Sequence, residues 1–471
     1  GSAYRTLSRV LDKLEIADKF KWFNTEEDPF FHSIGKYDTT PKGEKAFYDY
    51  SVDATVLAQK PDGTKFFPVI DTLHYDEKLK NAPKNTVVLI TDPDHDRLTI
   101  TQTEDISRVP ELEKAGIDYI KLNNKTILTV FTANQAFLML MDFWSKQQKA
   151  MGTWNNHPRF MIKTTASALS WDEWAKNNGV KVVNVPVGFK EIANIMKKVE
   201  LKLKNNPEED IVVDDVFSNS INLGKNPRLL FGGEESGGMI MGTEELIKSM
   251  HGRFAIAMRE KSATEAIVVA SALVAKLEKE NISLSQYLLN VFDENKIIGR
   301  FDTRVDIAYY NESEPDIEKL KQAKIIGEEL RTKNDLFYLS LAIAIREGKV
   351  SLEEVKQILS DAFNELNFSN LKSIKFVGDG TYMEFDDKYI EIRPSGTDAK
   401  TKAYGGGLNK SDIEKYATIL GNYSGDRTEL HKKYISQGFY NETKEQAMKY
   451  YLAFVEKDTN NEKFCIPEYS F

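Results

Sequence analysis

The chain has 471 residues and a formal net charge of −9, from 63 basic and 72 acidic side chains. This length allows two to four domains with ample core. The acidic balance, without a basic stripe interleaved with aromatic residues, argues against nonspecific nucleic-acid binding. The one cysteine, Cys465, excludes a disulfide framework and is typical of the reducing cytoplasm. The longest apolar run, residues 266–275, is too short to span a membrane.

The chain opens with a predicted amphipathic helix over residues 3–14. Its apolar side chains recur at helical spacing, at Leu7, Val10, Leu11 and Leu14. We expect this stripe to pack against a core.

An acidic loop follows a predicted buried strand at residues 86–90. Residues 92–97 read Asp-Pro-Asp-His-Asp-Arg, so that Asp92, Asp94 and Asp96 share one concave turn. Three such carboxylates repel one another unless a divalent cation lies among them. Oxygen ligands without cysteine or histidine favour Mg²⁺ over zinc. Arg97 adds a donor fork suited to phosphate. The alternative is an acidic surface turn.

The middle of the chain alternates helices and strands, which is typical of an α/β layer. A helix is predicted at 134–141, and strands at 160–163 and 180–185. The helix at 266–275 follows Ser-Ala-Thr-Glu at 262–265, a pattern that predicts a capping box. The acidic stretch at 204–210 is predicted to be a solvated loop.

A glycine-rich loop at 232–238 reads Gly-Gly-Glu-Glu-Ser-Gly-Gly and follows an apolar run at 228–231. Its glycines allow the backbone to approach a ligand closely. Glu234 and Ser236, two residues apart, offer an acceptor and a donor to neighbouring sugar hydroxyls. An ordinary glycine-rich turn is the alternative.

A third motif, at 392–397, reads Ile-Arg-Pro-Ser-Gly-Thr and ends a predicted half-buried strand. Arg393 can hold a phosphate through two hydrogen bonds, while Ser395, Thr397 and the Gly396 amide form a nest of further donors. Lys402 follows closely. The alternative is a tight turn beside a basic surface cluster. Beyond Gly421 the chain is charged and helical in pattern, without an assigned role.

In this order, the three motifs resemble those of the α-D-phosphohexomutase superfamily, the phosphoglucomutases and phosphomannomutases. A fourth match is Val-Pro-Val-Gly-Phe-Lys at 185–190, which resembles the family's segment at the substrate cleft. The resemblance implies an α/β fold, with two phosphohexomutase-type α/β domains and a C-terminal α+β phosphate-binding domain. The expected boundaries are 1–150 for an N-terminally incomplete metal-binding domain, 151–293 for a sugar-binding domain, and 294–471 for the phosphate-binding domain with its helical tail.

The resemblance also implies an intramolecular phosphotransferase that interconverts hexose 1-phosphate and hexose 6-phosphate through a bisphosphate. The residues that match the family's motifs fall into three groups. The metal ligands are Asp92, Asp94 and Asp96; the substrate-binding residues are Arg97, Gly188, Lys190, Glu234 and Ser236; and the phosphate-binding residues are Arg393, Ser395, Gly396, Thr397 and Lys402. The expected cofactors are Mg²⁺ and glucose 1,6-bisphosphate as activator, and the expected location is the cytoplasm, without a membrane partner.

The family's phosphoserine loop, a Thr-Ala-Ser-His-Asn-Pro-like sequence ahead of the metal loop, has no counterpart among the 91 residues before Asp92. Thr-Ala-Ser at 165–167 lies after the metal loop and lacks the His-Asn-Pro continuation. We therefore expect no catalytic nucleophile in this chain, which alone is expected to be inactive. A missing N-terminal phosphoserine domain is the expected partner.

Two positions depart from the family. Gly238 stands where some phosphomannomutases have a histidine, which favours a glucomutase-like member. His95 fills a position that is usually small, and we expect its side chain to point away from the metal. The open alternatives are phosphomannomutase, phosphopentomutase, a sugar-phosphate-binding pseudoenzyme and a metal-dependent phosphatase, although the last leaves the sugar and phosphate loops unexplained.

Overall fold

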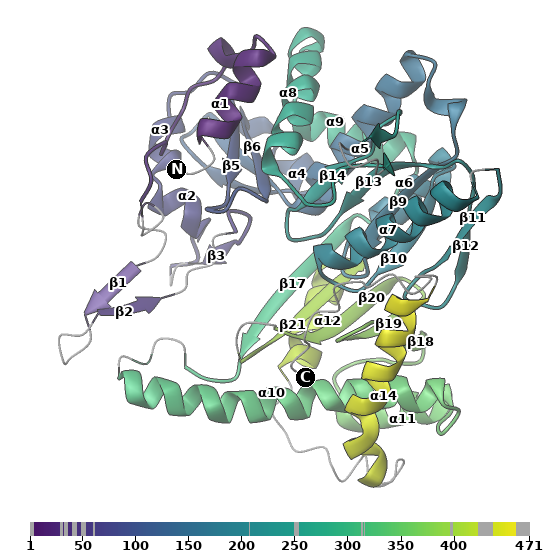
Figure 1. The fold of residues 1–471 in the computed structure, drawn as a ribbon. Coiled ribbons are helices and arrows are strands. Elements are labelled where there is room, and N and C mark those ends of the chain that lie inside the picture. The colour runs from purple at the N-terminus through teal and green to yellow at the C-terminus, as the bar shows by residue number, and fades with distance from the viewer. Residues whose placement is uncertain are drawn as a thin grey trace. The chain divides into compact units, whose positions relative to one another are not determined.

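The fold is that of a computed structural model and is mixed α/β (Figure 1). It describes residues 4–28, 32, 36–39, 45–48, 53–59, 62–206, 208–248, 254–311, 314, 316–395, 399–422 and 437–457. Cys465, Gly396 and Thr397 lie outside the described residues. Within that part of the chain, no helix is both long and apolar enough to cross a membrane.

The chain divides into two compact units. Unit 1 comprises Gly1–Met161 and Pro227–Ile297, and unit 2 comprises Ile162–Asn226 and Ile298–Phe471. The acidic loop at 92–97 (the metal loop) and the glycine-rich loop at 232–238 (the sugar loop) therefore belong to unit 1. The motif at 392–397 (the phosphate loop) belongs to unit 2. The finer division at residues 150 and 293 stays a prediction.

Unit 1 is built around an antiparallel sheet of order β5-β6-β8-β7. Its strands are β1 (Lys36–Thr39), β2 (Lys45–Tyr48), β3 (Ala58–Gln59), β4 (Lys65–Phe66), β5 (Val87–Thr91), β6 (Leu98–Asp105), β7 (Asp118–Lys121), β8 (Thr126–Phe131), β13 (Arg228–Gly233), β14 (Met239–Met241), β15 (Ile247–Lys248) and β16 (Phe254–Ala255). Its α-helices are α1 (Tyr4–Lys13), α2 (Pro68–Thr72), α3 (Tyr75–Leu79), α4 (Val109–Ala115), α5 (Ala133–Ala150), α8 (Ala263–Glu280) and α9 (Leu284–Glu294), with short 3-10 turns at Ala17–Lys19, Ile106–Arg108 and Trp154–Asn156.

Several predicted elements of unit 1 are confirmed. Helix α1 buries Leu7 and Leu11 of its predicted stripe. Helix α5 begins at a complete capping box, in which Thr132 accepts from the Gln135 amide and Gln135 returns the bond. The capping box predicted at 262–265 is wrong, because Ser262 makes no side-chain cap bond. Glu265 instead accepts from the Met241 amide at 3.1 Å.

Strand β5 lies where it was predicted, but it is half-buried along its whole length. It is the edge strand of its sheet among the described residues, so one of its sides has no neighbouring strand. The predicted burial is therefore wrong, because an apolar run of this length does not distinguish a central strand from an edge strand.

Unit 2 contains a five-stranded antiparallel sheet of order β17-β21-β20-β19-β18. Its elements are α6 (Leu169–Asn178), β10 (Lys181–Val185), α7 (Phe189–Asn205), β11 (Asp210–Asp214), β12 (Ser220–Lys225), β17 (Phe301–Ala308), α10 (Ile317–Arg346), α11 (Leu352–Ala362), β18 (Leu371–Phe376), β19 (Thr381–Phe385), β20 (Lys388–Pro394), β21 (Lys400–Gly407), α12 (Lys410–Gly421) and α14 (Gln437–Glu456). Strand β9 (Arg159–Thr164) contains the boundary between the units.

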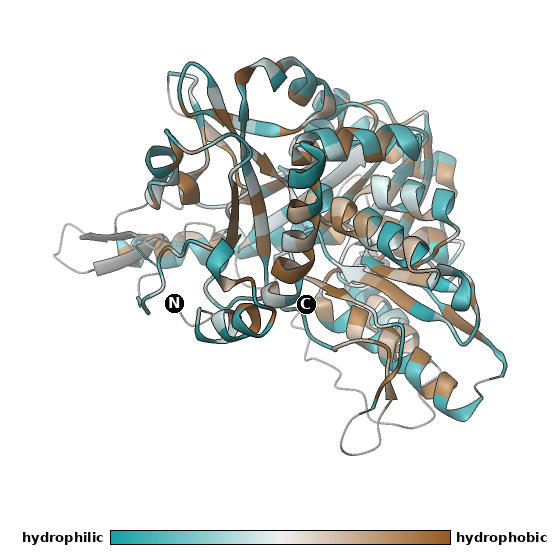
Figure 2. Ribbon diagram, turned by 90° about the horizontal axis from the view of Figure 1, so that it is seen from above, coloured by the Kyte–Doolittle hydropathy of each residue, from teal (hydrophilic) through white to brown (hydrophobic). Residues whose placement is uncertain are grey.

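The long helix α10 covers this sheet, and the C-terminal helix α14 crosses α10 (Figure 1). Both helices share one hydrophobic core with β18, β19 and β20. Strand β20 is buried on both faces up to Ile392, so the predicted half-buried pattern is wrong. The reason is that α10 and α14 cover the face that carries Ile390 and Ile392, while Tyr389 on the other face packs against Ala166 before α6. In Figure 2 the helices carry both hydrophobic and hydrophilic residues along their length, as partly exposed helices do.

Candidate functional site

The three acids of the metal-loop motif lie together after β5. Asp92, Asp94 and Asp96 each offer one carboxylate oxygen, and these three oxygens lie within 4.8 Å of one another. The loop folds back on itself, because Asp92 Oδ1 accepts from the amides of Asp96 and Arg97, each at 3.1 Å. The chain thus places three hard oxygen donors on one short turn, as a site for Mg²⁺ requires.

Positive charge already lies beside these acids. Arg97 Nε is 3.4 Å from Asp92 Oδ2 and 3.5 Å from Asp96 Oδ1. Burial nevertheless raises the pKa of Asp92 to about 7, and the Asp96 and Asp94 carboxylates add to that rise. The single positive charge of Arg97 therefore does not neutralise the three carboxylates. A divalent cation would, so the residues fit Mg²⁺.

His95 turns away from the acids, as the sequence predicted. Its Nε2 lies 2.8 Å from Thr264 Oγ1, and its carbonyl accepts from the Ala263 amide at 3.1 Å. Its backbone is left-handed, with φ of 62°. Burial lowers the pKa of the imidazole, which favours the neutral form. His95 therefore anchors the metal loop to the first turn of α8.

The sugar loop contacts the metal loop directly. The amide of Leu98 donates to the carbonyl of Gly237 at 3.1 Å, and the amide of Glu234 donates to the carbonyl of Gly238 at 3.1 Å. Gly237 has φ of 102°, and a Cβ there would lie 3.3 Å from Arg97 Cβ. Two motifs that are about 140 residues apart in the sequence thus form one continuous surface.

The two named side chains of the sugar loop differ in burial. Glu234 is buried, whereas Ser236 is half-buried. Ser236 lines a cavity of about 20 Å³ together with Asp92 and Arg97. The predicted sugar-binding hydroxyl therefore lies beside the predicted metal ligand and the predicted phosphate-binding arginine of unit 1.

Lys261 contacts both of these loops and was not among the site residues predicted from the sequence. Its Nζ lies 2.7 Å from Glu234 Oε1 and 3.3 Å from Asp96 Oδ2, with 12% of the side chain exposed. Burial alone would lower the pKa of Lys261, but Glu234 and Asp96 together raise it. The lysine therefore carries its charge. It lies in a short charged run before α8, and such runs are usually solvated turns, so no local signal distinguishes it.

Gly238 provides the space that this lysine uses. A Cβ at Gly238 would lie 2.3 Å from Lys261 Cδ and 2.9 Å from Glu234 Oε1. Any side chain at this position would displace one of the two. Packing therefore requires a glycine at position 238, which the sequence of the motif alone does not reveal.

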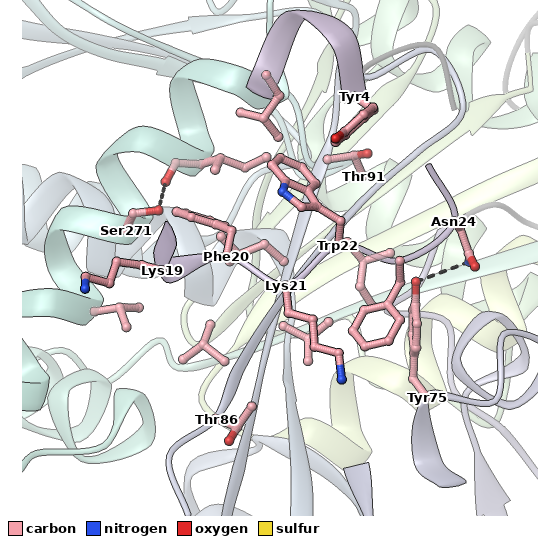
Figure 3. Close-up of a pocket in the computed structure, with 18 of the residues that line it drawn as sticks. Tyr4, Lys19, Phe20, Lys21, Trp22, Asn24, Tyr75, Thr86, Thr91 and Ser271 are labelled. Carbon is pink, nitrogen blue, oxygen red and sulfur yellow. Dashed lines mark hydrogen bonds between the residues drawn. The ribbon is translucent and has the colours of Figure 1, made fainter. Parts of the chain in front are cut away.

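A cavity in unit 1, lined mainly by apolar side chains, has a volume of about 1780 Å³. Figure 3 shows Tyr4, Phe20 and Trp22 among its lining side chains, with Asn24 donating to the Tyr75 hydroxyl at 3.3 Å. Asp92 and His95 belong to its lining as well. The cavity exceeds the usual 300–1,000 Å³ of a small-ligand pocket, and it explains why the side chains of β5 are half-exposed.

In unit 2, Arg393 stands at the end of β20, beside Lys402 on β21. Asp379 accepts from Arg393 Nε at 3.1 Å and from Nη2 at 2.5 Å. Burial alone would lower the pKa of Arg393, but Asp379 holds it well above its usual value. Asp379 lies in the turn between β18 and β19. Its role as the partner of Arg393 was not predicted.

Side chains of α10 contact the described part of the phosphate loop and its neighbouring strand. Arg331 on α10 donates from Nη1 to the Ser395 carbonyl at 2.9 Å, and the Ser395 amide donates to the Lys400 carbonyl at 2.8 Å. Thr401 donates to Asp335 at 3.1 Å, and burial raises the pKa of Asp335 to about 7. The loop base is therefore preorganised by side chains of α10.

Gly188 and Lys190 begin helix α7. Gly188 is the N-cap, with φ of 127°. Burial lowers the pKa of Lys190, and the Arg393 cation lowers it further, whereas the Glu191 and Asp379 carboxylates raise it. Lys190 is thus within electrostatic reach of the Arg393–Asp379 pair. The structure brings this segment and the phosphate-loop motif together within unit 2.

Ser167, the serine of the Thr-Ala-Ser sequence at 165–167, is fully buried. Its hydroxyl lies 2.8 Å from Thr164 Oγ1. Lys163, which is itself buried, donates to the Ser167 carbonyl at 3.1 Å and to Asp172 at 2.5 Å. This arrangement is that of a polar core turn between β9 and α6, and it leaves no access for a substrate.

Comparison with known proteins identifies the central part of the chain. Residues 132–294 match the family model of the phosphoglucomutase/phosphomannomutase alpha/beta/alpha domain III. The phosphoglucomutases of Staphylococcus aureus strains N315 and Mu50 are each 21% identical over 327 residues, which is 69% of this chain and 46% of those proteins. The chain therefore spans less than half the length of these curated relatives.

Solved structures of the same superfamily are also similar. A phosphoglucomutase/phosphomannomutase family protein from Burkholderia thailandensis has a TM-score of 0.37 at 12% identity, covering 79% of this chain and 55% of that protein. The N-acetylphosphoglucosamine mutase of Aspergillus fumigatus, in complex with GlcNAc-6P and magnesium, has a TM-score of 0.36 at 10% identity, covering 74% of this chain and 51% of that protein.

Proposed function

We propose that this chain, which belongs to the α-D-phosphohexomutase superfamily, provides the metal, sugar and phosphate loops of a phosphoglucomutase-type enzyme. That enzyme interconverts hexose 1-phosphate and hexose 6-phosphate through a bisphosphate. The observation that carries the proposal is the junction of the first two loops, made by the Leu98–Gly237 hydrogen bond and by Lys261 between Asp96 and Glu234.

In this proposal, Asp92, Asp94 and Asp96 hold Mg²⁺. The bound ion supplies positive charge to the phosphoryl group in transfer. Arg97 and Lys261 contribute fixed charges to the same end. Their side chains are already held by Asp92, Asp96 and Glu234, so little reorganisation is needed when a substrate binds.

Glu234 and Ser236 bind the sugar. Glu234 accepts from one sugar hydroxyl, and Ser236 exchanges a hydrogen bond with a neighbouring one. Both contacts use hydroxyls rather than phosphates, so they suit a bisphosphate held in either orientation. For the same reason they do not distinguish glucose from mannose or pentose phosphates. Phosphomannomutase and phosphopentomutase therefore remain alternative activities.

The phosphate that does not react binds to unit 2. Arg393 is the main anchor, and Ser395, Gly396, Thr397 and Lys402 complete the site. Lys190 at the start of α7 adds a second cation, with Gly188 allowing close approach of the backbone. A cation whose pKa burial lowers gains most from a phosphate, because the anion restores the charge that burial disfavours.

The phosphoryl carrier in this proposal is the phosphoserine of an N-terminal phosphoserine domain that lies outside these 471 residues. Its phosphorus–oxygen bond breaks, a new one forms to the free sugar hydroxyl, and the hydroxyl proton passes to the released serine oxygen. Glucose 1,6-bisphosphate serves as the activator that rephosphorylates this serine. The buried hydroxyl of Ser167 supports a carrier other than Ser167. We place the enzyme in the cytoplasm, on the basis of the single cysteine in its sequence.

A coupled assay tests this proposal. Glucose 1-phosphate and catalytic glucose 1,6-bisphosphate should give no glucose 6-phosphate with the chain alone, and turnover should begin when a phosphorylated N-terminal phosphoserine domain is added. Intact mass should show no phosphate on this chain. Turnover by the chain alone, with a phosphoryl group on it, would contradict the assignment of the carrier.

A sugar-phosphate-binding pseudoenzyme is the second candidate. It would bind glucose 1,6-bisphosphate in calorimetry, and turnover would fail with every phosphoserine domain supplied. One observation favours this candidate: Ser167 of the Thr-Ala-Ser turn is fully buried, so it is not accessible as a nucleophile.

A further inference from the structure

The C-terminal helix α14 packs beside the proposed phosphate site of unit 2. Its buried residues Ala447, Tyr451 and Val455 belong to the same core as β18, β19 and β20. Its end is fastened to α7 and β11, because Lys198 donates to the Phe454 carbonyl at 2.6 Å and Lys457 forms an ion pair with Asp214. The helix therefore links the segment that begins with Gly188 to the five-stranded sheet.

Tyr451 is the residue of α14 that reaches the substrate segment. Its hydroxyl donates to Glu191 Oε1 at 2.5 Å, and both residues are fully buried. The same Glu191 oxygen lies 3.9 Å from the Nζ of Lys190. Glu191 also caps the turn, since its amide donates to the Gly188 carbonyl at 3.0 Å. The phenol thus holds the carboxylate that faces the proposed phosphate-binding lysine.

The ring of Tyr451 reaches the turn that supports Arg393. A Cβ at Gly378 would lie 2.8 Å from Pro186 Cβ and 4.0 Å from Tyr451 Cδ2. Pro186 precedes the Gly188 segment, and Gly378 precedes Asp379, the partner of Arg393. One aromatic side chain therefore stands where the lysine segment and the arginine turn meet.

We propose that Tyr451 is a positioning residue of the phosphate site, which fixes Lys190 through Glu191 and Arg393 through the Gly378–Asp379 turn. The C-terminal helix thereby sets the spacing of the two cations that receive a phosphate. This inference rests on the proposed function of the site, and it gives the tail beyond Gly421 a role that its sequence pattern does not reveal.

The hydrogen bond is the part of this link that can be removed alone. Tyr451→Phe keeps the ring against Gly378 and Pro186 and deletes only the donor to Glu191. A buried carboxylate that loses a donor attracts the nearest cation more strongly, so Lys190 is drawn towards Glu191 and away from the phosphate. The expected effect is a loss of affinity for phosphate, together with a lower melting temperature that reflects the donor lost by the buried carboxylate.

Calorimetry of the full chain with glucose 1,6-bisphosphate, and separately with inorganic phosphate, tests the inference. Tyr451→Phe should weaken binding about 3- to 10-fold, because Lys190 is displaced rather than removed, and its melting temperature should fall because the buried Glu191 loses a donor. Tyr450→Phe is the matched control. Tyr450 is the neighbouring residue on α14, and its hydroxyl contacts Glu347 at 3.2 Å, at the end of α10. This control should bind as the unaltered chain does.

Hydrogen exchange adds a readout that a purely structural role would not produce. In Tyr451→Phe, the amides of residues 187–191 and 377–380 should exchange faster together, while those of α12 keep their protection. Affinity equal to that of the unaltered chain, or a fall in melting temperature without a loss of affinity, would overturn the inference.

Arg393→Ala separates this inference from the proposed function. If Arg393→Ala binds no phosphate and Tyr451→Phe binds normally, the phosphate site stands and the role of Tyr451 is wrong. If Arg393→Ala binds normally, the site itself is wrong. Tyr451→Leu, which also removes the ring edge beside Gly378, should weaken binding further than Tyr451→Phe, and equal affinities would exclude the contribution of the ring.

Discussion

Arg393 gives two of its five N–H donors to Asp379, from Nε at 3.1 Å and from Nη2 at 2.5 Å. The carboxylate thus covers one side of the guanidinium and fixes its plane, and at most three donors remain for a phosphate. An arginine held in this way is preorganised, because the cost of ordering its long side chain is met before the ligand arrives.

Arg393→Ala should remove most of the affinity for glucose 1-phosphate and glucose 1,6-bisphosphate. A hydrogen bond to a charged group is worth about 1.5–3 kcal/mol, which corresponds to roughly 10- to 150-fold in affinity. Calorimetry measures the loss, with Lys372→Ala as the control, because Lys372 pairs with Asp386 at the exposed surface of β18. A change of less than twofold would show that Arg393 is not the anchor.

Asp379→Ala should destabilise the fold, and added phosphate should restore part of the lost stability. The substitution leaves a guanidinium that is 11% exposed without its carboxylate, and breaking such a pair costs about 3–5 kcal/mol. Inorganic phosphate can replace the missing anion, so it should raise the melting temperature of Asp379→Ala more than that of the unaltered chain. Equal shifts in the two proteins would mean that phosphate does not reach Arg393.

Lys261→Met should have opposite effects on the two proposed ligands of unit 1. The ammonium lies 3.3 Å from Asp96 and 2.7 Å from Glu234. Its removal takes a positive charge away from the metal ligands, so Mg²⁺ should bind at least about threefold more tightly. Hexose phosphate should bind more weakly, since the substrate loses the same charge. Lys276→Met, on the exposed face of α8, should change neither affinity as measured by calorimetry.

Glu265→Gln should alter the pH dependence of stability. Burial raises the pKa of Glu265 to about 7, while the Met241 amide opposes the rise. Between about pH 4.5 and 7, the folded chain then holds more protons than the unfolded chain, so the free energy of unfolding falls as pH rises through this window.

The glutamine variant lacks that titration. It should be more stable than the unaltered chain above pH 7, by about 1–3 kcal/mol, with the difference vanishing near pH 4. Urea denaturation at pH 4.5, 6 and 8 measures this, with Glu280→Gln at the exposed end of α8 as control. A constant difference at all three pH values would indicate a packing effect instead.

The sequence predicted the chemistry of the loops because the residue types required are local. Three acids on alternate positions are candidate ligands for a cation, and the loop between β5 and β6 brings their oxygens within 4.8 Å of one another. The predicted orientation of His95 is also confirmed. Strand and helix positions follow from the spacing of apolar residues, and this spacing is visible within the segments of β9 and α5 themselves.

The sequence could not reveal what each local pattern contacts. Ser262 and Glu265 have capping-box spacing, yet Glu265 accepts from Met241 on β14, because the packing of α8 offers a closer donor. The burial of β20 on both faces likewise depends on the segments that pack against the sheet, α10 on one face and Ala166 on the other, rather than on its own alternation.

By itself, the sequence determined which residues are candidates to hold a cation, a sugar and a phosphate, since donor and acceptor types are fixed residue by residue. Only the tertiary structure decided which side chains hold those residues in place. Lys261 contacts Asp96 from 165 positions away, and Tyr451 contacts Glu191 from 260 positions away. Such pairs have no spacing to recognise, because the packing of whole helices against a sheet sets their distance.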